Sequence, residues 1–134
     1  MQVSILTSAV YMEKVLKQHQ VSFKNAFAGL FWSLQTQPNF RVHITLSVAV
    51  LLLAWFLGVT RTEFGVLVFT VLLGLSAEMI NTSLECMTDL ITHEWREDAK
   101  HAKDVAAGMM LLVAMGAAII GVWILGPYIV LRFL

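Results

Sequence analysis

Glu78-Met-Ile-Asn81-Thr-Ser-Leu-Glu85-Cys-Met-Thr-Asp89 follows a run, residues 64–77, that carries no charge. On a helix that turns about 100° per residue, the three acids and the amide named here fall within about 80° of one another. At a rise of about 1.5 Å per residue they form a stripe about 16 Å long. We call Glu78, Asn81, Glu85 and Asp89 the polar stripe.

The uncharged run before the polar stripe belongs in lipid, so we expect Glu78 to lie inside a membrane and the stripe to descend from it to water. Ionisable residues at that depth are costly and usually functional. Two acids on one helix face have no simple structural explanation, and Glu78 and Glu85 are therefore predicted to be functional. Asp89, at the water boundary, can equally cap or solvate a helix end.

Composition indicates a membrane protein with one domain. Of the 134 residues, 58% are hydrophobic and only 13% are charged. The formal net charge is zero, so nothing suggests a nucleic-acid partner. The single cysteine, Cys86, cannot form an internal disulfide and reads as a packing residue. We expect no cleavable signal peptide.

The expected fold is all-α, with three transmembrane helices over about 42–59, 64–90 and 103–126, each long enough to cross about 30 Å of hydrocarbon. Gly126-Pro127 is expected to stop the third span. Residues 58–63 allow only a tight turn, whereas residues 93–104 form a charged, partly helical connection.

An amphipathic helix is predicted before the spans, over residues 22–36, and Pro38 follows its end. This helix either lies in the membrane interface or packs on the spans, and both can hold. Residues 22–134 then make up the membrane domain. Residues 1–21 form a partly ordered N-terminal segment, with a short interfacial helix near residues 11–16 as the alternative.

Lysine and arginine predict the orientation. Seven of these residues precede the first span or lie between the second and third, and two lie on the other side. The seven are Lys14, Lys17, Lys24, Arg41, Arg96, Lys100 and Lys103, and the two are Arg61 and Arg132. The N-terminus and the second connection are therefore expected in the cytoplasm.

Small residues in the third span, at Ala114, Ala118 and at Ala117, Gly121, have the spacing that lets membrane helices approach closely. Three helices alone make a thin bundle that shields Glu78 and Asn81 poorly from lipid. A homo-oligomer is therefore expected.

The polar stripe suggests phosphoryl chemistry, although the chain has no Gly-x-x-x-x-Gly-Lys-Ser/Thr loop. Glu78, partly desolvated, suits a general base. Glu85 can ligate a divalent cation whose remaining ligands are phosphates. Asn81 can orient Glu78 or a phosphate oxygen, and Lys103 can neutralise phosphate charge.

The connection offers Glu94, Trp95 and Arg96 as contacts for a base and ribose, although a solvated loop is the simpler reading. Asp104 begins the third span at the level of Asp89. His43 reads as an interfacial side chain rather than a ligand.

Glu78-x-x-Asn81-Thr-Ser-x-Glu85-x-x-x-Asp89, followed by Ala102-Lys103-Asp104, resembles the signature of the small prokaryotic diacylglycerol kinases, a family that includes undecaprenol kinases. Ser22-Phe23-Lys24-x-Ala26-Phe27-x-Gly29 and Asn39-Phe40-Arg41-x-His43 resemble most closely the undecaprenol-kinase branch. The resemblance covers roughly residues 21–126.

This resemblance implies a homotrimer of three-span subunits in the bacterial cytoplasmic membrane, with active sites at subunit boundaries near the cytoplasmic face. The reaction it implies transfers the γ-phosphate of Mg-ATP to the hydroxyl of a membrane lipid, either diacylglycerol or undecaprenol. By position the resemblance implies that Glu78 is the base and that Glu85 is a metal-binding carboxylate. It gives polar active-site roles to Asn81, Asp89, Lys103 and Asp104. It implies nucleotide contacts for Glu94, Trp95 and Arg96, and a place near the lipid entry for Lys24.

One position departs from the family pattern. A glutamate expected three residues before Phe40-Arg41, as a second metal ligand, is Gln37 here. A carboxamide offers an uncharged oxygen, and Mg²⁺ favours carboxylates. Either the metal site is weaker, or the alignment shifts in this segment.

Two other classes of function are open. A small proton-coupled transporter could use Glu78 as its exchange site, but it needs neither a second carboxylate nor a basic connection. A non-enzymatic packing subunit leaves both Glu78 and Glu85 unexplained.

Overall fold

The computed structural model describes residues 2–133, and side chains are described for residues 17–133. The described chain contains four helices: α1 (Gln2–Thr36), α2 (Pro38–Leu57), α3 (Arg61–Ile91) and α4 (Glu97–Phe133). Helix α1 forms one compact unit, and residues from Gln37 onward form a second. The all-α prediction is confirmed.

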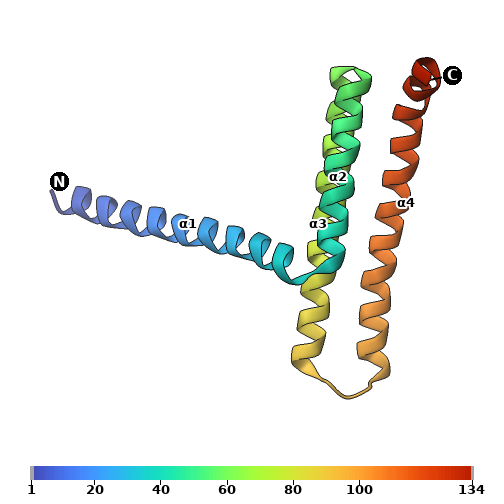
Figure 1. Cartoon of the computed structure of the whole chain (residues 1–134). Coiled ribbons are helices and arrows are strands. Elements are labelled where there is room, and N and C mark those ends of the chain that lie inside the picture. Colours follow the sequence, from blue (N-terminus) through green and yellow to red (C-terminus); the bar gives the residue numbers. More distant parts are fainter. Residues whose placement is uncertain (1, 134) are drawn as a thin grey trace. The chain divides into compact units, whose positions relative to one another are not determined.

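Helices α2, α3 and α4 are each long and apolar enough to cross a membrane, as the sequence predicted. They lie side by side with alternating direction (Figure 1). In lipid a helix satisfies its own backbone hydrogen bonds, which is why apolar segments take this form. All three helices begin before their predicted first residues. Helix α2 ends near its predicted last residue, whereas α3 and α4 each continue past theirs.

The turn between α2 and α3 is as tight as residues 58–63 predicted. Gly58 ends α2 with φ 72°, a left-handed conformation that glycine adopts without a Cβ clash. Thr60 then begins α3 with a capping box, in which its side chain accepts from the Glu63 N–H and the Glu63 carboxylate accepts from the Thr60 N–H. We call this end of the three-helix unit the turn end.

Helix α4 differs from the prediction at its C-terminal side, because it continues through Pro127 to Phe133 instead of stopping at Gly126-Pro127. Its final turns bend away from the axis of the helix (Figure 1). Tyr128 Oη donates a hydrogen bond to Glu63 Oε2 over 2.7 Å, and the Arg132 guanidinium lies 4.5 Å from the centre of the Phe56 ring. These contacts hold the bent segment on the turn end.

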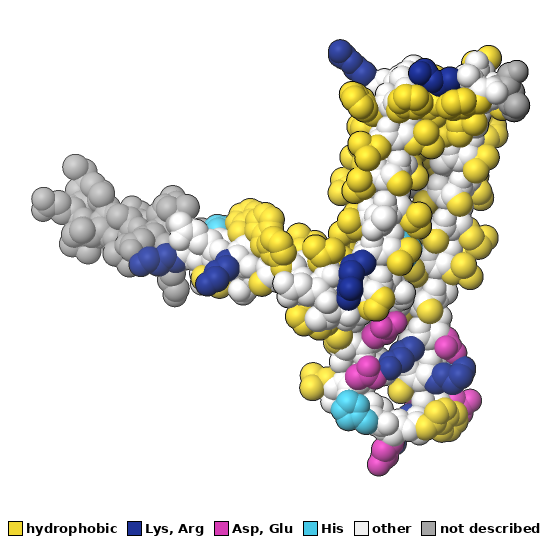
Figure 2. Space-filling model, viewed as in Figure 1, with side chains coloured by type: hydrophobic (Ala, Val, Ile, Leu, Met, Phe, Trp, Pro, Cys, Tyr) yellow, Lys and Arg dark blue, Asp and Glu magenta, His cyan; other side chains and the backbone are white. Residues whose placement is uncertain are grey.

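The hydrophobic core lies toward the turn end, where α2, α3 and α4 all contribute. It consists of Ala54, Leu57, Leu67, Ile124 and Leu125. Away from it, large apolar side chains cover the outer faces of the three helices (Figure 2). Apolar side chains facing outward are what a lipid solvent favours.

Helix α1 begins at Gln2, well before the predicted first residue 22, and ends at Thr36. Pro38 occupies the first position of α2, where its missing N–H costs nothing. The aromatic side chains of the predicted apolar stripe, Phe23, Phe27 and Phe31, are all exposed. That α1 lies in the membrane interface stays a prediction.

The capping box of α3 predicts a measurable loss of stability in Thr60→Ala. Removing the cap should lower the free energy of unfolding by about 1 kcal/mol. Thermal unfolding of the purified protein in detergent measures this loss. Thr62→Ala is the matched control, because Thr62 lies in the same turn, is exposed and is not the cap. Equal stability of the two variants would contradict the role given to Thr60.

Candidate active site

The polar stripe passes from the buried interior to solvent along α3. Glu78 is 3% exposed and Asn81 is 6% exposed, whereas Glu85 is half-buried and Asp89 is exposed. A single chain therefore shields Glu78 and Asn81, so the expectation that three helices alone would shield them poorly is wrong, and the homo-oligomer stays a prediction. The graded exposure follows from the four residues sharing one face of the helix.

The length of α3 explains this gradient. Its 31 residues span about 46 Å at about 1.5 Å per residue, which exceeds the hydrocarbon thickness of about 30 Å. Counted from Arg61, about 20 residues are enough to cross the hydrocarbon, so a bilayer that begins at Arg61 would end near Asn81. The last turns of α3 would then extend beyond it together with the first turns of α4.

Asn81 and Glu85 interact directly. Asn81 Nδ2 donates a hydrogen bond to Glu85 Oε1 over 2.9 Å, as expected for side chains one helical turn apart. Asn81 Oδ1 is buried and accepts no hydrogen bond from the described residues. A buried acceptor without a donor is uncommon in native proteins. It marks a place where a cation or a donor group would be favoured.

Ion pairs join α3 to α4 beyond this point. Lys103 Nζ donates to Asp89 Oδ1, which links the two helices. Lys100 Nζ donates to Asp104 Oδ2 over 2.6 Å along α4. The sequence had placed Lys103 at the level of Asp89, and the structure agrees.

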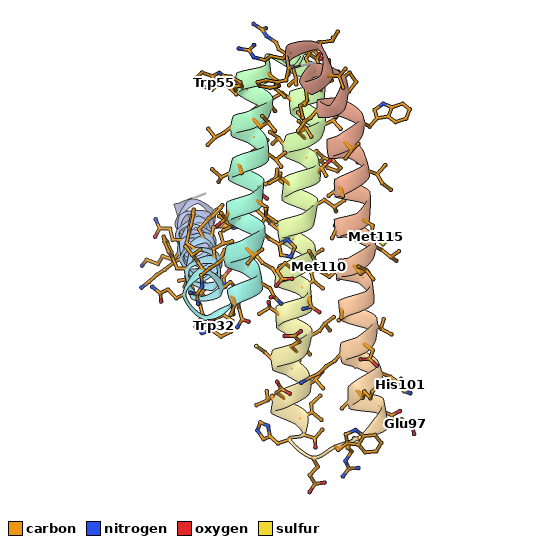
Figure 3. All side chains as sticks on the ribbon, turned by 45° about the vertical axis from the view of Figure 1, so that its right-hand side comes forward. Trp32, Trp55, Glu97, His101, Met110 and Met115 are labelled. Atoms are coloured by element: carbon orange, nitrogen blue, oxygen red, sulfur yellow. The ribbon has the colours of Figure 1, made fainter. Side chains whose placement is uncertain are left out.

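A pocket of about 410 Å³ opens where α3 and α4 are joined, and we call this end of the three-helix unit the connection end. Charged side chains gather there (Figure 2). Glu97 and His101 lie at this end, and Trp55 lies at the turn end (Figure 3). The pocket is lined by Thr88, Asp89, Thr92, His93, Glu94, Trp95, Arg96, Ala99, Lys100, Lys103 and Asp104.

Six of the predicted site residues share this pocket: Asp89, Glu94, Trp95, Arg96, Lys103 and Asp104. Glu78, Asn81 and Glu85 lie farther along α3 toward the turn end. Lys24 is exposed on α1, in the other unit. Gln37 is the residue before α2 and is half-buried.

Sequence reasoning missed several residues of the site. Thr88, next to Asp89, Thr92, at the end of α3, and Lys100, one helical turn before Lys103, also line the pocket. His43, read as an interfacial side chain, places Nε2 4.0 Å from Glu78 Oε2. Its place in Asn39-Phe40-Arg41-x-His43 was a signal, but the contact depends on the register of α2 against α3.

Magnesium was expected at Glu85. Within residues 17–133, no three His, Cys, Asp or Glu side chains gather as a complete metal site. Glu85 nevertheless offers a carboxylate beside the buried Asn81 Oδ1, and both are oxygen ligands of the kind that Mg²⁺ prefers. Because Mg²⁺ usually takes one or two carboxylates and completes its shell with water and phosphate, these residues fit it.

The three apolar helices and the polar site at their connection end define a membrane protein of three spans. Residues 24–125 match the family model for prokaryotic diacylglycerol kinase. The chain belongs to this family, which confirms the resemblance carried by the polar stripe and Ala102-Lys103-Asp104.

Curated relatives bear two names. A diacylglycerol kinase of Synechocystis is 42% identical over 108 residues, which cover 80% of this chain and 62% of that protein. An undecaprenol kinase of Bacillus subtilis is 35% identical over 107 residues, 79% of this chain and 86% of the relative. A diacylglycerol kinase of Helicobacter pylori is 31% identical over 97 residues, which cover 67% of this chain and 76% of that protein. The chain thus spans less than two thirds of the Synechocystis protein.

Proposed function

We propose that the chain is a lipid kinase that transfers the γ-phosphate of Mg-ATP to the hydroxyl of a membrane lipid. The observation that carries the proposal is the polar stripe, which runs from the buried Glu78 to a pocket open to solvent. A reaction between a membrane lipid and a soluble nucleotide needs such a polar path from lipid to water. Family membership supports the same reaction class.

The nucleotide would occupy the pocket at the connection end. Trp95 is 80% exposed, so its ring is open to stack on a base. Arg96, Lys100 and Lys103 bring positive charge for the phosphates. In this proposal Lys103 changes its partner when ATP binds. In the structure its ammonium group donates to Asp89, and it would donate to a phosphate oxygen of bound ATP instead.

Glu85 and Asn81 Oδ1 would hold Mg²⁺, which supplies charge neutralisation on the phosphates when bound. The hydrogen bond from Asn81 Nδ2 orients the Glu85 carboxylate in advance, so little conformational entropy is lost when Mg²⁺ binds. Gln37 lies at the same level by helix register. It precedes His43 by six residues and Glu85 follows Glu78 by seven, so both are displaced by about 9–10 Å from the His43–Glu78 contact.

Glu78 would act as the general base. It takes the proton of the lipid hydroxyl while the hydroxyl oxygen bonds to the γ-phosphorus and the bond to the ADP oxygen breaks. Its burial keeps water away from the reacting oxygen, so the lipid competes well with hydrolysis of ATP. Positioning and charge neutralisation supply most of the acceleration.

The acceptor is diacylglycerol or undecaprenol, each of which presents a primary hydroxyl on an apolar tail. Relatives bear both names. The general activity of the family favours diacylglycerol, whereas the motif Ser22-Phe23-Lys24-x-Ala26-Phe27-x-Gly29 favours undecaprenol. Lys24, exposed on α1, would contact the polar end of the lipid. Assays of the purified protein with each lipid and labelled ATP separate the two acceptors.

The working form we propose is a homotrimer in the bacterial cytoplasmic membrane, with active sites at subunit boundaries. The N-terminus and the connection end face the cytoplasm, which agrees with the lysine and arginine distribution and with the location of ATP. The transporter alternative predicts proton movement without ATP consumption, whereas lipid-stimulated ATP consumption excludes it.

Replacing the base tests the mechanism. Glu78→Gln keeps the size of the side chain but cannot accept the proton, so kcat should fall by at least about 100-fold while the KM for ATP changes little. Labelled ATP in mixed micelles measures both constants. Glu97→Gln, an exposed glutamate at the start of α4, is the control. A near-normal rate in Glu78→Gln would remove Glu78 from the mechanism.

Trp95 should report nucleotide binding directly. In a variant with Trp32, Trp55 and Trp123 replaced by Phe, Mg-ATP should quench the fluorescence of Trp95 saturably. A variant that keeps only Trp123 is the control, because Trp123 is 82% exposed near the other end of α4. Trp95→Ala should raise the KM for ATP about 5- to 150-fold, since stacking on a base contributes about 1–3 kcal/mol. An unchanged KM and no quenching would rule out stacking.

Gln37→Glu should strengthen the metal site. A second carboxylate near the level of Glu85 adds charge that Mg²⁺ favours. The Mg²⁺ concentration for half-maximal activity should therefore fall, as measured by titrating Mg²⁺ at fixed ATP. Gln35→Glu adds the same charge to α1 and serves as the control. An unchanged Mg²⁺ requirement in Gln37→Glu would show that residue 37 does not contribute to the metal site.

A further inference from the structure

His43 contacts the buried carboxylate from a neighbouring helix. Its Nε2 lies 4.0 Å from Glu78 Oε2, and the two side chains are 30% and 4% exposed. Helix α2 supplies His43 and α3 supplies Glu78, so the contact depends on tertiary packing rather than on spacing within one helix. The imidazole is thus a more open group placed directly beside a closed one.

A general base that is almost closed to solvent has a further requirement. After each turnover Glu78 holds the proton of the lipid hydroxyl, and it must lose this proton before it can act again. The exposed fraction of its side chain is only 4%, so direct exchange with water is restricted. The imidazole of His43 can accept and release a proton, lies 4.0 Å from this carboxylate and is itself 30% exposed.

We propose, on the basis of the lipid-kinase function, that His43 is a positioning residue that orients Glu78 and takes over its proton. Glu78 Oε2 gains the proton as the lipid O–P bond forms and the bond from the γ-phosphorus to ADP breaks. The proton then passes to His43 Nε2, and from the imidazolium to water, which returns both groups to their starting forms. At 4.0 Å the two groups are close enough for this exchange, because a small side-chain rotation brings them to hydrogen-bond distance.

The electrostatic surroundings of Glu78 support this role. Glu85 lies on the same helix and repels a negative charge on Glu78, whereas the imidazolium that His43 becomes on taking the proton attracts it. This attraction favours transfer of the proton from Glu78 to His43 on α2. Ionisable groups within membrane spans are usually paired for such a purpose.

The experiment compares His43→Gln and His43→Ala with the wild type, using the full chain in mixed micelles. His43→Gln should lower kcat about 10- to 100-fold, less than the loss of the base itself, and leave the KM for ATP within about twofold. Added imidazole should restore at least about fivefold of the lost rate in His43→Ala, because it can enter the space and carry the proton. Glu78→Gln should gain nothing from imidazole.

His101→Ala is the matched control, since His101 also pairs with a glutamate, Glu97, over 3.6 Å but is exposed. A kcat within twofold of wild type in His43→Gln would overturn the proposal. So would a loss in His43→Ala that imidazole does not restore, because that result indicates packing alone. Turnover of either lipid by the wild type upholds the lipid-kinase function whatever the His43 variants do, so the two failures are distinguishable.

Discussion

The Glu78 carboxylate lies 4.0 Å from the His43 imidazole on a face of α3 that is almost closed to solvent. A carboxylate in such surroundings is costly unless it has a partner, so α2 must hold His43 in register with α3. Counting residues from this contact puts Gln37 near the level of Glu85. One pairing between two helices therefore relates the depths of the proposed base, of the proposed metal ligands and, farther along α3, of the proposed nucleotide pocket.

Much of the fold could be predicted from sequence because membrane spans obey simple physical rules. Three uncharged runs gave three helices, and Gly58 with the Thr60–Glu63 capping box ended one helix and began the next. Pro127 misled the prediction, because a proline in a membrane helix is tolerated when neighbouring groups compensate. The contacts that hold the segment after Pro127 on the turn end, Tyr128 with Glu63 and Arg132 with Phe56, join residues far apart in the chain and cannot be read from local pattern.

In the candidate site, too, contacts within one helix could be predicted and contacts between helices mostly could not. Residues related by one helical period, such as Asn81 and Glu85, were predictable as neighbours, and the structure adds their hydrogen bond. Residues on different helices were harder: the sequence predicted a common level for Asp89 and the start of the third span but not the pairing of Lys103 with Asp89, and His43 was assigned to the interface. Burial of Glu78 within a single chain was missed because packing between α2, α3 and α4 has no signature in one sequence. The family resemblance, carried by the polar stripe, was sufficient to identify the class.

The bend of α4 at the turn end has a consequence for how the protein can be altered. The aliphatic core, the capping box and the Tyr128–Glu63 contact all gather there, whereas the polar stripe and the pocket lie toward the opposite end. The stability of the three-helix unit and its proposed activity thus depend on separate sets of side chains. The half of the spans nearer the turn end can therefore be altered to suit a thicker or hotter bilayer while the polar site at the connection end stays as it is.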